Sequence, residues 1–215
     1  MSAASDAQMR ARLAATDKDL AALIRRIGPV RMEVARRRSP YEALVRAIAH
    51  QQLHARAAEA ILGRMLALRP DEAFPPPEAL LGHEVEQLRG CGFSASKIAA
   101  LRDIAARAID GTIPTRAAAR RLDDAALIER LTSVRGVGRW TVEMLLIFTL
   151  GRPDVLPVDD FGVREGWRLI KRAEQQPRPR ELAEIGAAWA PYRSAAAWYL
   201  WRAADEGKKI KPLTI

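Results

Sequence analysis

The sequence predicts an all-α protein. Ala, Leu, Arg and Glu are abundant, and apolar residues recur at the i, i+3, i+4 and i+7 spacing of helices that bury one face. No segment shows a convincing alternation of β-branched residues, which is the pattern of strands. Four prolines within residues 70–77 predict a connector between helices. With 215 residues, the chain is long enough to bury a core without disulfides.

The individual helices follow from apolar spacing and stop signals. The first is closed by Gly28-Pro29, and the second presents Leu44, Val45 and Ile48 on one face. Asp123 or Asp124 can cap the helix that begins at residue 125. The expected helices span residues 19–27, 40–49, 55–68, 77–81, 84–88, 95–110, 125–131, 139–150, 160–173, 179–188 and 191–205.

Composition narrows the class of protein. Lys and Arg number 35 against 26 Asp and Glu, which gives a formal charge of +9 and favours a polyanionic partner such as nucleic acid. A single cysteine excludes an intramolecular disulfide, a Cys-only zinc site and a Cys-ligated iron–sulfur cluster. The sequence shows neither a membrane span nor a signal peptide. We therefore expect a cytoplasmic protein, nucleoid-associated if bacterial, with no membrane partner.

One segment carries a functional signal. Residues 131–141 read Leu-Thr-Ser-Val-Arg-Gly-Val-Gly-Arg-Trp-Thr, so a Gly-x-Gly turn at Gly136 and Gly138 joins two helices. The first N–H groups of the second helix have no partner within it, and with the helix dipole they suit a phosphate. An ordinary turn between two helices would have the same glycines. The basic charge of the chain favours the phosphate site.

The motif and its surroundings resemble a known family. The hairpin is followed by Leu150-Gly-Arg-Pro-Asp-Val-Leu-Pro-Val-Asp-Asp-Phe-Gly-Val-Arg, and together they resemble the helix-hairpin-helix–Gly/Pro/Asp DNA glycosylases. The similarity is greatest to the compact form of the alkylation-repair branch, DNA-3-methyladenine glycosylase II. Two further stretches that fit this branch begin at Tyr41 (Tyr-Glu-Ala-Leu-Val-Arg-Ala-Ile-Ala-His-Gln-Gln-Leu-His) and at Trp189 (Trp-Ala-Pro-Tyr-Arg-Ser-Ala-Ala-Ala-Trp-Tyr-Leu-Trp). The resemblance covers residues 20–205.

This resemblance implies the fold and the reaction. We expect two helical lobes with the active cleft between them, one formed by residues 1–44 and 166–215 and the other by residues 45–165, with the hairpin within residues 125–150. The enzyme would flip an alkylated purine out of double-stranded DNA and hydrolyse its N-glycosidic bond, leaving an abasic site. It would act as a monomer and require no cofactor.

Asp160 is the candidate catalytic residue. Cleavage of the C1′–N bond places positive charge on the sugar, and a carboxylate in a site from which water is excluded can stabilise that charge. The N–H groups of the helix that begins after Asp160 favour the ionised carboxylate. From the residues alone, Asp160 could instead serve only as a helix cap, and Asp159 competes for either role. The resemblance assigns catalysis to Asp160, the second Asp of the pair.

Aromatic residues predict the base pocket and the type of reaction. Trp140 stands where family members that also cut the DNA backbone have a Schiff-base lysine, so the resemblance implies a monofunctional enzyme. A buried core tryptophan is the structural alternative at this position. Trp201 matches a pocket aromatic of the family, whereas Trp189 and Trp198 are expected in the core. Met144 completes the predicted pocket, at a position where relatives carry Tyr.

The resemblance also implies the DNA contacts. In the loop 50–54, Gln52 and Leu53 would fill the gap left by the flipped base and His54 would probe the minor groove. Helix capping or ordinary hydrogen bonding is an equal alternative for His50 and His54. At the hairpin, the predicted DNA-binding residues are Gly136, Gly138, Arg139 and Thr141.

No group of His, Asp or Glu has the spacing of a catalytic metal site. Relatives hold one monovalent cation, Na⁺ or K⁺, at the hairpin, and the backbone carbonyls of Thr132, Val134 and Val137 match those positions. Two other functions stay open: a bifunctional glycosylase for oxidised bases, which Trp140 disfavours, and a non-catalytic module that binds damaged or bent DNA, which the intact Asp160 disfavours.

Overall fold

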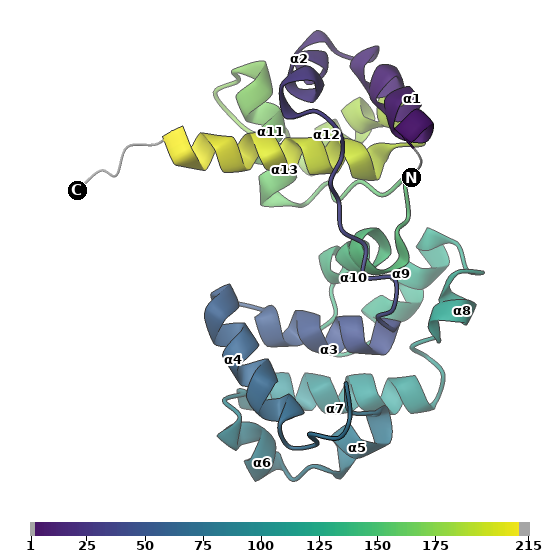
Figure 1. Ribbon diagram of the computed structural model, residues 1–215, viewed down its shortest axis with the longest axis vertical. Helices are drawn as coiled ribbons and strands as arrows, with labels where there is room; N and C mark the ends of the chain where they lie inside the picture. The colour runs from purple at the N-terminus through teal and green to yellow at the C-terminus, as the bar shows by residue number, and fades with distance from the viewer. Residues whose placement is uncertain (1–2, 211–215) are drawn as a thin grey trace. The chain divides into compact units, whose positions relative to one another are not determined.

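The computed structural model describes the backbone of residues 3–210 and the side chains of residues 5–207. Within residues 3–210 all regular structure is helical (Figure 1), which confirms the predicted fold class. The chain divides into two compact units. We call residues 1–33 with 151–215 the terminal unit, and residues 34–150 the central unit.

The division lies at different residues from those predicted. Residues 34–44 belong to the central unit because the Ala35 N–H donates to the Phe148 carbonyl at 2.8 Å, which ties the two ends of that unit together. Residues 151–165 belong to the terminal unit because the loop that leads to Asp160 is bonded to the last helix. There the Ser194 N–H donates to the Pro153 carbonyl at 3.0 Å.

The terminal unit is built around one close pair of helices, α11 (Phe161–Lys171) and α13 (Arg193–Ile210). Gly166 is buried against the backbone of Leu200, where a Cβ atom would overlap the Leu200 carbonyl, so these helices pack backbone to backbone. Trp189 and Tyr199 fill the core beside them, and the Tyr199 hydroxyl donates to the Gly28 carbonyl at 2.7 Å. The helices are α1 (Ala3–Ala14), α2 (Lys18–Ile27), α11 (Phe161–Lys171), α12 (Pro179–Gly186), a 3₁₀ turn (Ala187–Trp189) and α13 (Arg193–Ile210), and the close pair is α11 and α13.

The central unit gathers around its first helix, α3, which packs against α4, α7 and α10. Leu44, Val45 and Ile48, the predicted apolar face of α3, are fully buried. The helices are α3 (Pro40–His50), α4 (Ala55–Leu66), α5 (Pro77–Gly82), α6 (Val85–Gly90), α7 (Ala95–Ile109), α8 (Arg116–Ala119), α9 (Asp124–Thr132) and α10 (Arg139–Leu145), which continues into a π-helical turn (Leu146–Leu150).

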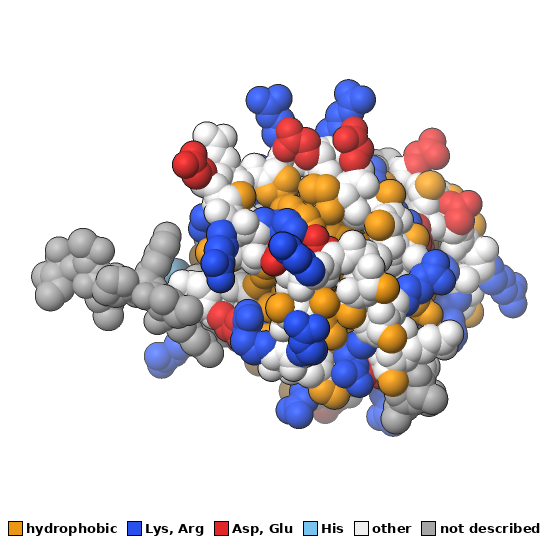
Figure 2. All heavy atoms as spheres, turned by 90° about the horizontal axis from the view of Figure 1, so that it is seen from above, with side chains coloured by type: hydrophobic (Ala, Val, Ile, Leu, Met, Phe, Trp, Pro, Cys, Tyr) orange, Lys and Arg blue, Asp and Glu red, His pale blue; other side chains and the backbone are white. Residues whose placement is uncertain are grey.

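The structure differs from the predicted helices in three places. Helices α1 and α8 were not expected, and the single helix predicted over 139–150 changes from α to π geometry after Leu145. The ends of the other helices differ by a few residues, most of all at α13. No helix of the described chain is both long and apolar enough for a bilayer. On the face drawn in Figure 2, most Asp and Glu side chains lie in the upper part beside Lys and Arg, whereas Lys and Arg predominate over the lower half.

Candidate functional site

Asp160 lies at the start of α11, in the terminal unit. Its Oδ1 accepts the backbone N–H of Val163 at 2.8 Å, which caps the helix, and also the indole N–H of Trp201 at 2.8 Å. The residue is 9% exposed, whereas Asp159 is exposed. The capping alternative is therefore correct as a description of one contact, but a cap alone does not account for the second donor from α13.

The loop before Asp160 is fastened to the start of α13. Arg193 pairs with Asp154 through two parallel hydrogen bonds of 2.8 Å, and this pairing lowers the pKa of the Asp154 carboxyl group. The buried Ser194 hydroxyl donates to the Arg152 carbonyl at 2.8 Å and accepts the Val155 N–H at 3.0 Å. The position of the loop that leads to Asp160 is thus fixed by contacts to α13, the helix that also carries Trp201.

Two neighbours of Asp160 were not assigned a role from the sequence. The Phe161 side chain is 66% exposed although it immediately follows the buried carboxylate. Gly162 lies against the ring of Trp201, because an ideal Cβ at this position would be 2.8 Å from Trp201 Cδ1. A glycine two residues after the Asp pair was the sequence signal for this close approach. It could not be read without knowing which helix packs there.

The loop 50–54 and the hairpin form one cluster in the central unit. Gln52 adopts a left-handed backbone with φ of 56°, which is strained for a residue other than glycine, and Leu53 is 41% exposed. The Gln51 side chain donates to the Gly136 carbonyl at 3.0 Å, so the loop is tied to the hairpin. The sequence motifs assign no role to Gln51.

The two histidines of this loop differ. His50 hydrogen-bonds to the Glu59 carboxylate at 3.0 Å, which fits the ordinary alternative for this residue. His54 precedes α4, but its side chain makes no capping bond there, and it is exposed. The structure therefore leaves the His54 ring on the surface beside Leu53, as a contact to DNA requires.

The hairpin glycines are not equivalent. Gly136 has φ of 77°, and a Cβ there would crowd Ala100 and Ile48 at 3.1 and 3.2 Å. Gly138 has an extended backbone, and nothing lies within 4 Å of a Cβ placed on it. Only Gly136 is therefore needed for the turn, whereas Gly138 leaves open space at the start of α10.

The two predicted DNA-binding residues that follow the turn differ in their exposure to solvent. The Arg139 side chain is 61% exposed and pairs with the buried Glu143 at 2.9 Å. Thr141 is buried, so its side chain is not a surface contact and the prediction is restricted to its backbone N–H in the first turn of α10. Of the predicted phosphate contacts after the turn, Gly138 and Arg139 are exposed.

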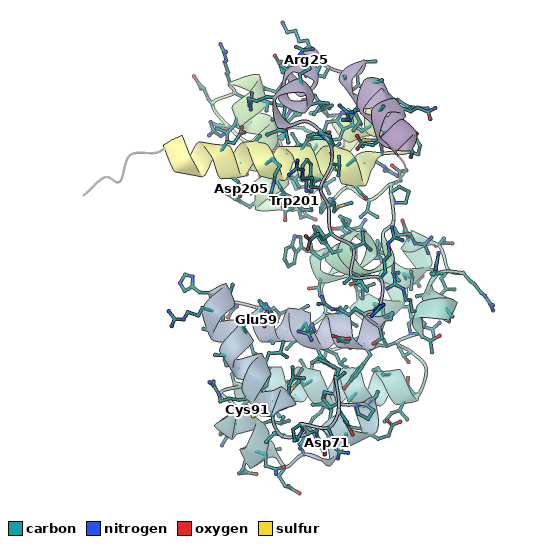
Figure 3. All side chains as sticks on the ribbon, in the orientation of Figure 1. Arg25, Glu59, Asp71, Cys91, Trp201 and Asp205 are labelled. Carbon is teal, nitrogen blue, oxygen red and sulfur yellow. The ribbon has the colours of Figure 1, made fainter. Side chains whose placement is uncertain are left out.

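The residues of the predicted base pocket lie in both units. Trp140 is 48% exposed, which rules out the buried-core alternative, while Trp189 and Trp198 are buried as expected. Met144 lines a hollow of about 350 Å³ in the central unit, together with Arg46, His50, Glu59 and Phe148. Trp201, in the terminal unit, is partly buried and bonded to Asp160 (Figure 3 labels it on α13).

The proposed cation site consists of carbonyl oxygens where α9 runs into the hairpin. The last carbonyls of a helix lack intrahelical partners, and Thr132 is the last residue of α9. The Val134 carbonyl accepts the Val137 N–H at 3.1 Å and keeps a second lone pair. Uncharged carbonyl oxygens are ligands that suit Na⁺ or K⁺, and the cation site at Thr132, Val134 and Val137 stays a prediction. Among the described residues, no cluster of His, Cys, Asp and Glu could hold a metal.

Known proteins share this sequence and fold. Residues 45–191 match the family described as HhH-GPD superfamily base excision DNA repair protein, and the chain belongs to that family. It is 44% identical over 93% of its length to the DNA-3-methyladenine glycosylase 1 of Schizosaccharomyces pombe, of which it covers 90%.

Two solved structures are similar to this chain in both sequence and fold. The S. pombe 3-methyladenine DNA glycosylase in complex with abasic DNA has a TM-score of 0.83 and 43% identity, with 91% of this chain and 95% of that chain covered. A DNA-3-methyladenine glycosidase from Bacillus halodurans has a TM-score of 0.84 and 34% identity, with 93% and 90% covered. Both alignments cover at least 90% of each chain.

Proposed function

We propose that this protein is a monofunctional DNA glycosylase that removes alkylated purines, of the 3-methyladenine type, from double-stranded DNA. The observation that carries the proposal is Asp160: a buried carboxylate fixed at a helix start by two donors. The relatives with similar length and fold act on 3-methyladenine by their names. Because one of them carries the number 1, the type II label from the sequence is not kept.

The chemistry requires little beyond a fixed negative charge. A purine alkylated at N3 or N7 is already cationic, so it takes the electrons of the C1′–N bond and leaves as a neutral base. The positive charge passes to the sugar, where the Asp160 carboxylate can stabilise it. Water then adds its oxygen to C1′ and loses a proton, which leaves an abasic site. No general acid for the leaving base is needed.

The central unit would supply the grip on DNA. Gly138 and Arg139 would meet a phosphate, Leu53 would fill the gap in the duplex, and Trp140 would stack against the extruded base. A monovalent cation on the carbonyls of Thr132, Val134 and Val137 would add positive charge beside that phosphate. Burial of Thr141 leaves this arrangement intact, because its backbone N–H is sufficient.

The reaction should stop at base release. A strand-cutting glycosylase needs an amine nucleophile, and Trp140 has none. The two lysines in the middle of the chain are engaged elsewhere. Lys97 donates to the Ala49 carbonyl at 2.9 Å, and Lys171 pairs with Asp17 and Asp19 at 2.8 and 2.7 Å.

The test is release of methylated bases from duplex DNA treated with a methylating agent, using the full chain. Asp160→Asn should lower the rate about 10²–10³-fold while DNA affinity changes only a few-fold, because it removes charge but keeps the cap. Asp159→Asn, the matched control, should keep most activity. Product strands should break only after alkali.

Each other outcome selects a different function. DNA binding without base release would identify a non-catalytic binding module. Strand breaks before alkali, or a covalent protein–DNA adduct trapped by borohydride, would identify a bifunctional enzyme and contradict the argument from Trp140. Full activity in Asp160→Asn would move the catalytic role to another residue.

A further inference from the structure

We propose that Trp201 and Gly162 are positioning residues for Asp160, in addition to any stacking of Trp201 on the base. The inference rests on the proposed function, since it assigns how the catalytic carboxylate is held. The indole N–H fixes Asp160 Oδ1, and residue 162 is glycine because only glycine leaves room for the indole edge at that distance.

The first observation is the pair of donors on one oxygen. Oδ1 of Asp160 accepts from Val163 N and from Trp201 Nε1, each at 2.8 Å. The first donor belongs to α11 itself, and the second reaches across from α13. A cap bond alone fixes the carboxylate relative to its own helix. The second bond also fixes it relative to α13, the helix that fastens the preceding loop through Arg193 and Ser194.

The second observation is the space at Gly162. An ideal Cβ there would lie 2.8 Å from Trp201 Cδ1, 3.2 Å from Trp201 Nε1 and 3.1 Å from Asp160 Oδ1. Gly162 is not in the left-handed region, so its backbone would accept any residue. Space is therefore the reason for glycine. One turn later, Gly166 brings α13 close, and Gly162 admits the ring to the carboxylate.

The electrostatic consequence follows from burial. A carboxylate that is 9% exposed has lost much of its hydration, and donors must replace it if the group is to stay charged. A hydrogen bond to a charged oxygen is stronger than one between neutral groups. Without the indole N–H, Asp160 keeps its cap, but its carboxylate is held less firmly at the place where the sugar cation forms.

The decisive probes contain no base. We compare the affinity for duplex DNA with a pyrrolidine abasic analogue, whose ring nitrogen is cationic, against a tetrahydrofuran analogue, which is neutral. The ratio of the two affinities reports the charge that Asp160 presents to the sugar. Trp201→Phe keeps an aromatic ring but removes the donor, and should lower this ratio about ten-fold. Single-turnover excision should slow similarly, while affinity for tetrahydrofuran DNA stays within two-fold.

The control and the double variant separate the alternatives. Trp198→Phe, on the same helix, should leave the ratio unchanged. Gly162→Ala should lower the ratio as Trp201→Phe does, and the double variant should be no worse than either single one, because both remove the same bond. Urea unfolding of each variant reports whether the fold is kept, and Trp201→Phe alone decides the role of Trp201 if Gly162→Ala does not fold.

Results that contradict this inference can be distinguished from results that contradict the proposed function. If the wild-type protein releases methylated bases but Trp201→Phe leaves the affinity ratio unchanged, Trp201 is only a stacking residue and the inference is wrong. Additive losses in the double variant would overturn the part of Gly162. If the wild-type protein releases no base at all, the proposed function itself fails.

Discussion

The end of the terminal unit that carries Asp160 and the end of the central unit that carries Leu53 are organised in opposite ways. Asp160 is 9% exposed, capped by its own helix and bonded to a second one. Leu53 and Trp140 are 41% and 48% exposed, and Leu53 follows a strained left-handed residue. A fixed charge must be excluded from water and held still, whereas side chains that enter DNA must project from the protein.

The difference predicts that substitutions near Asp160 affect stability more than substitutions near Leu53, in the proposed DNA-contacting loop. Around Asp160, substitutions should disturb helix packing as well as activity. Leu53 is 41% exposed, so truncation of its side chain opens to solvent and should destabilise the protein less than truncation of a buried one. Substitutions near Asp160 should therefore lower both stability and activity, whereas substitutions near Leu53 should lower activity alone.

The largest expected effect is on folding, at the contact between α11 and α13. Gly166→Ala should destabilise the protein by at least about 3 kcal/mol, because the new methyl group would overlap the Leu200 carbonyl. In the central unit, Gly63 lies within α4 and a methyl group added to it would have no atom within 4 Å, so Gly63→Ala should stabilise by about 0.5–1 kcal/mol. Urea denaturation measures both, and equal effects would contradict the comparison.

Leu53→Ala should affect activity and not stability. Losing this apolar side chain should cost about 1–3 kcal/mol in the flipped state and slow excision from fully paired DNA accordingly. The defect should shrink on mismatched lesions, whose bases unpair at lower cost. Ile109→Ala removes a side chain of the same unit that is 50% exposed and should leave excision unchanged. Wild-type excision by Leu53→Ala would mean that this loop is not the wedge.

Asp154→Asn should give the smallest effect, and one that depends on pH. The Arg193 hydrogen bonds depress the folded-state pKa of Asp154 below its ordinary value of 3.8. The ionised pair therefore stabilises the fold above pH 3.8, and that contribution is lost as pH falls through the lower folded-state value. Because Arg193 is partly exposed, we expect the variant to lose about 1 kcal/mol at pH 7. Its deficit in urea unfolding should narrow below pH 4.

Much of the fold was predictable because apolar spacing is a local signal. Leu44, Val45 and Ile48 mark the buried face of α3 in the sequence, and the structure buries all three. Helix α1 was missed because Met9 and Leu13, both fully buried, offer only one i, i+4 pair in an otherwise small and polar segment. The unit boundaries were missed because hydrogen bonds between distant residues, such as that from Ala35 to Phe148, leave no local pattern.

The candidate site was also predictable only where its signals are local in the sequence. The Asp pair and the Gly-x-Gly turn are contiguous motifs, so their position in the chain could be read directly. Which atom of Asp160 is held, and by which helix, depends on Trp201 at a distance of 41 residues. The burial of Thr141 likewise follows from packing around α10 and not from its place beside Trp140.

The hydrogen bond from Gln51 to the Gly136 carbonyl has a consequence for how damage is found. It joins the segment that would enter the duplex to the segment that would hold its backbone, so under the proposed function the depth of Leu53 would be set as soon as a phosphate is bound. A protein that slid along DNA on such contacts would press every base pair to the same extent, without a rearrangement of its own. Selection is then left to the DNA: the steps that yield are those whose stacking is already weak.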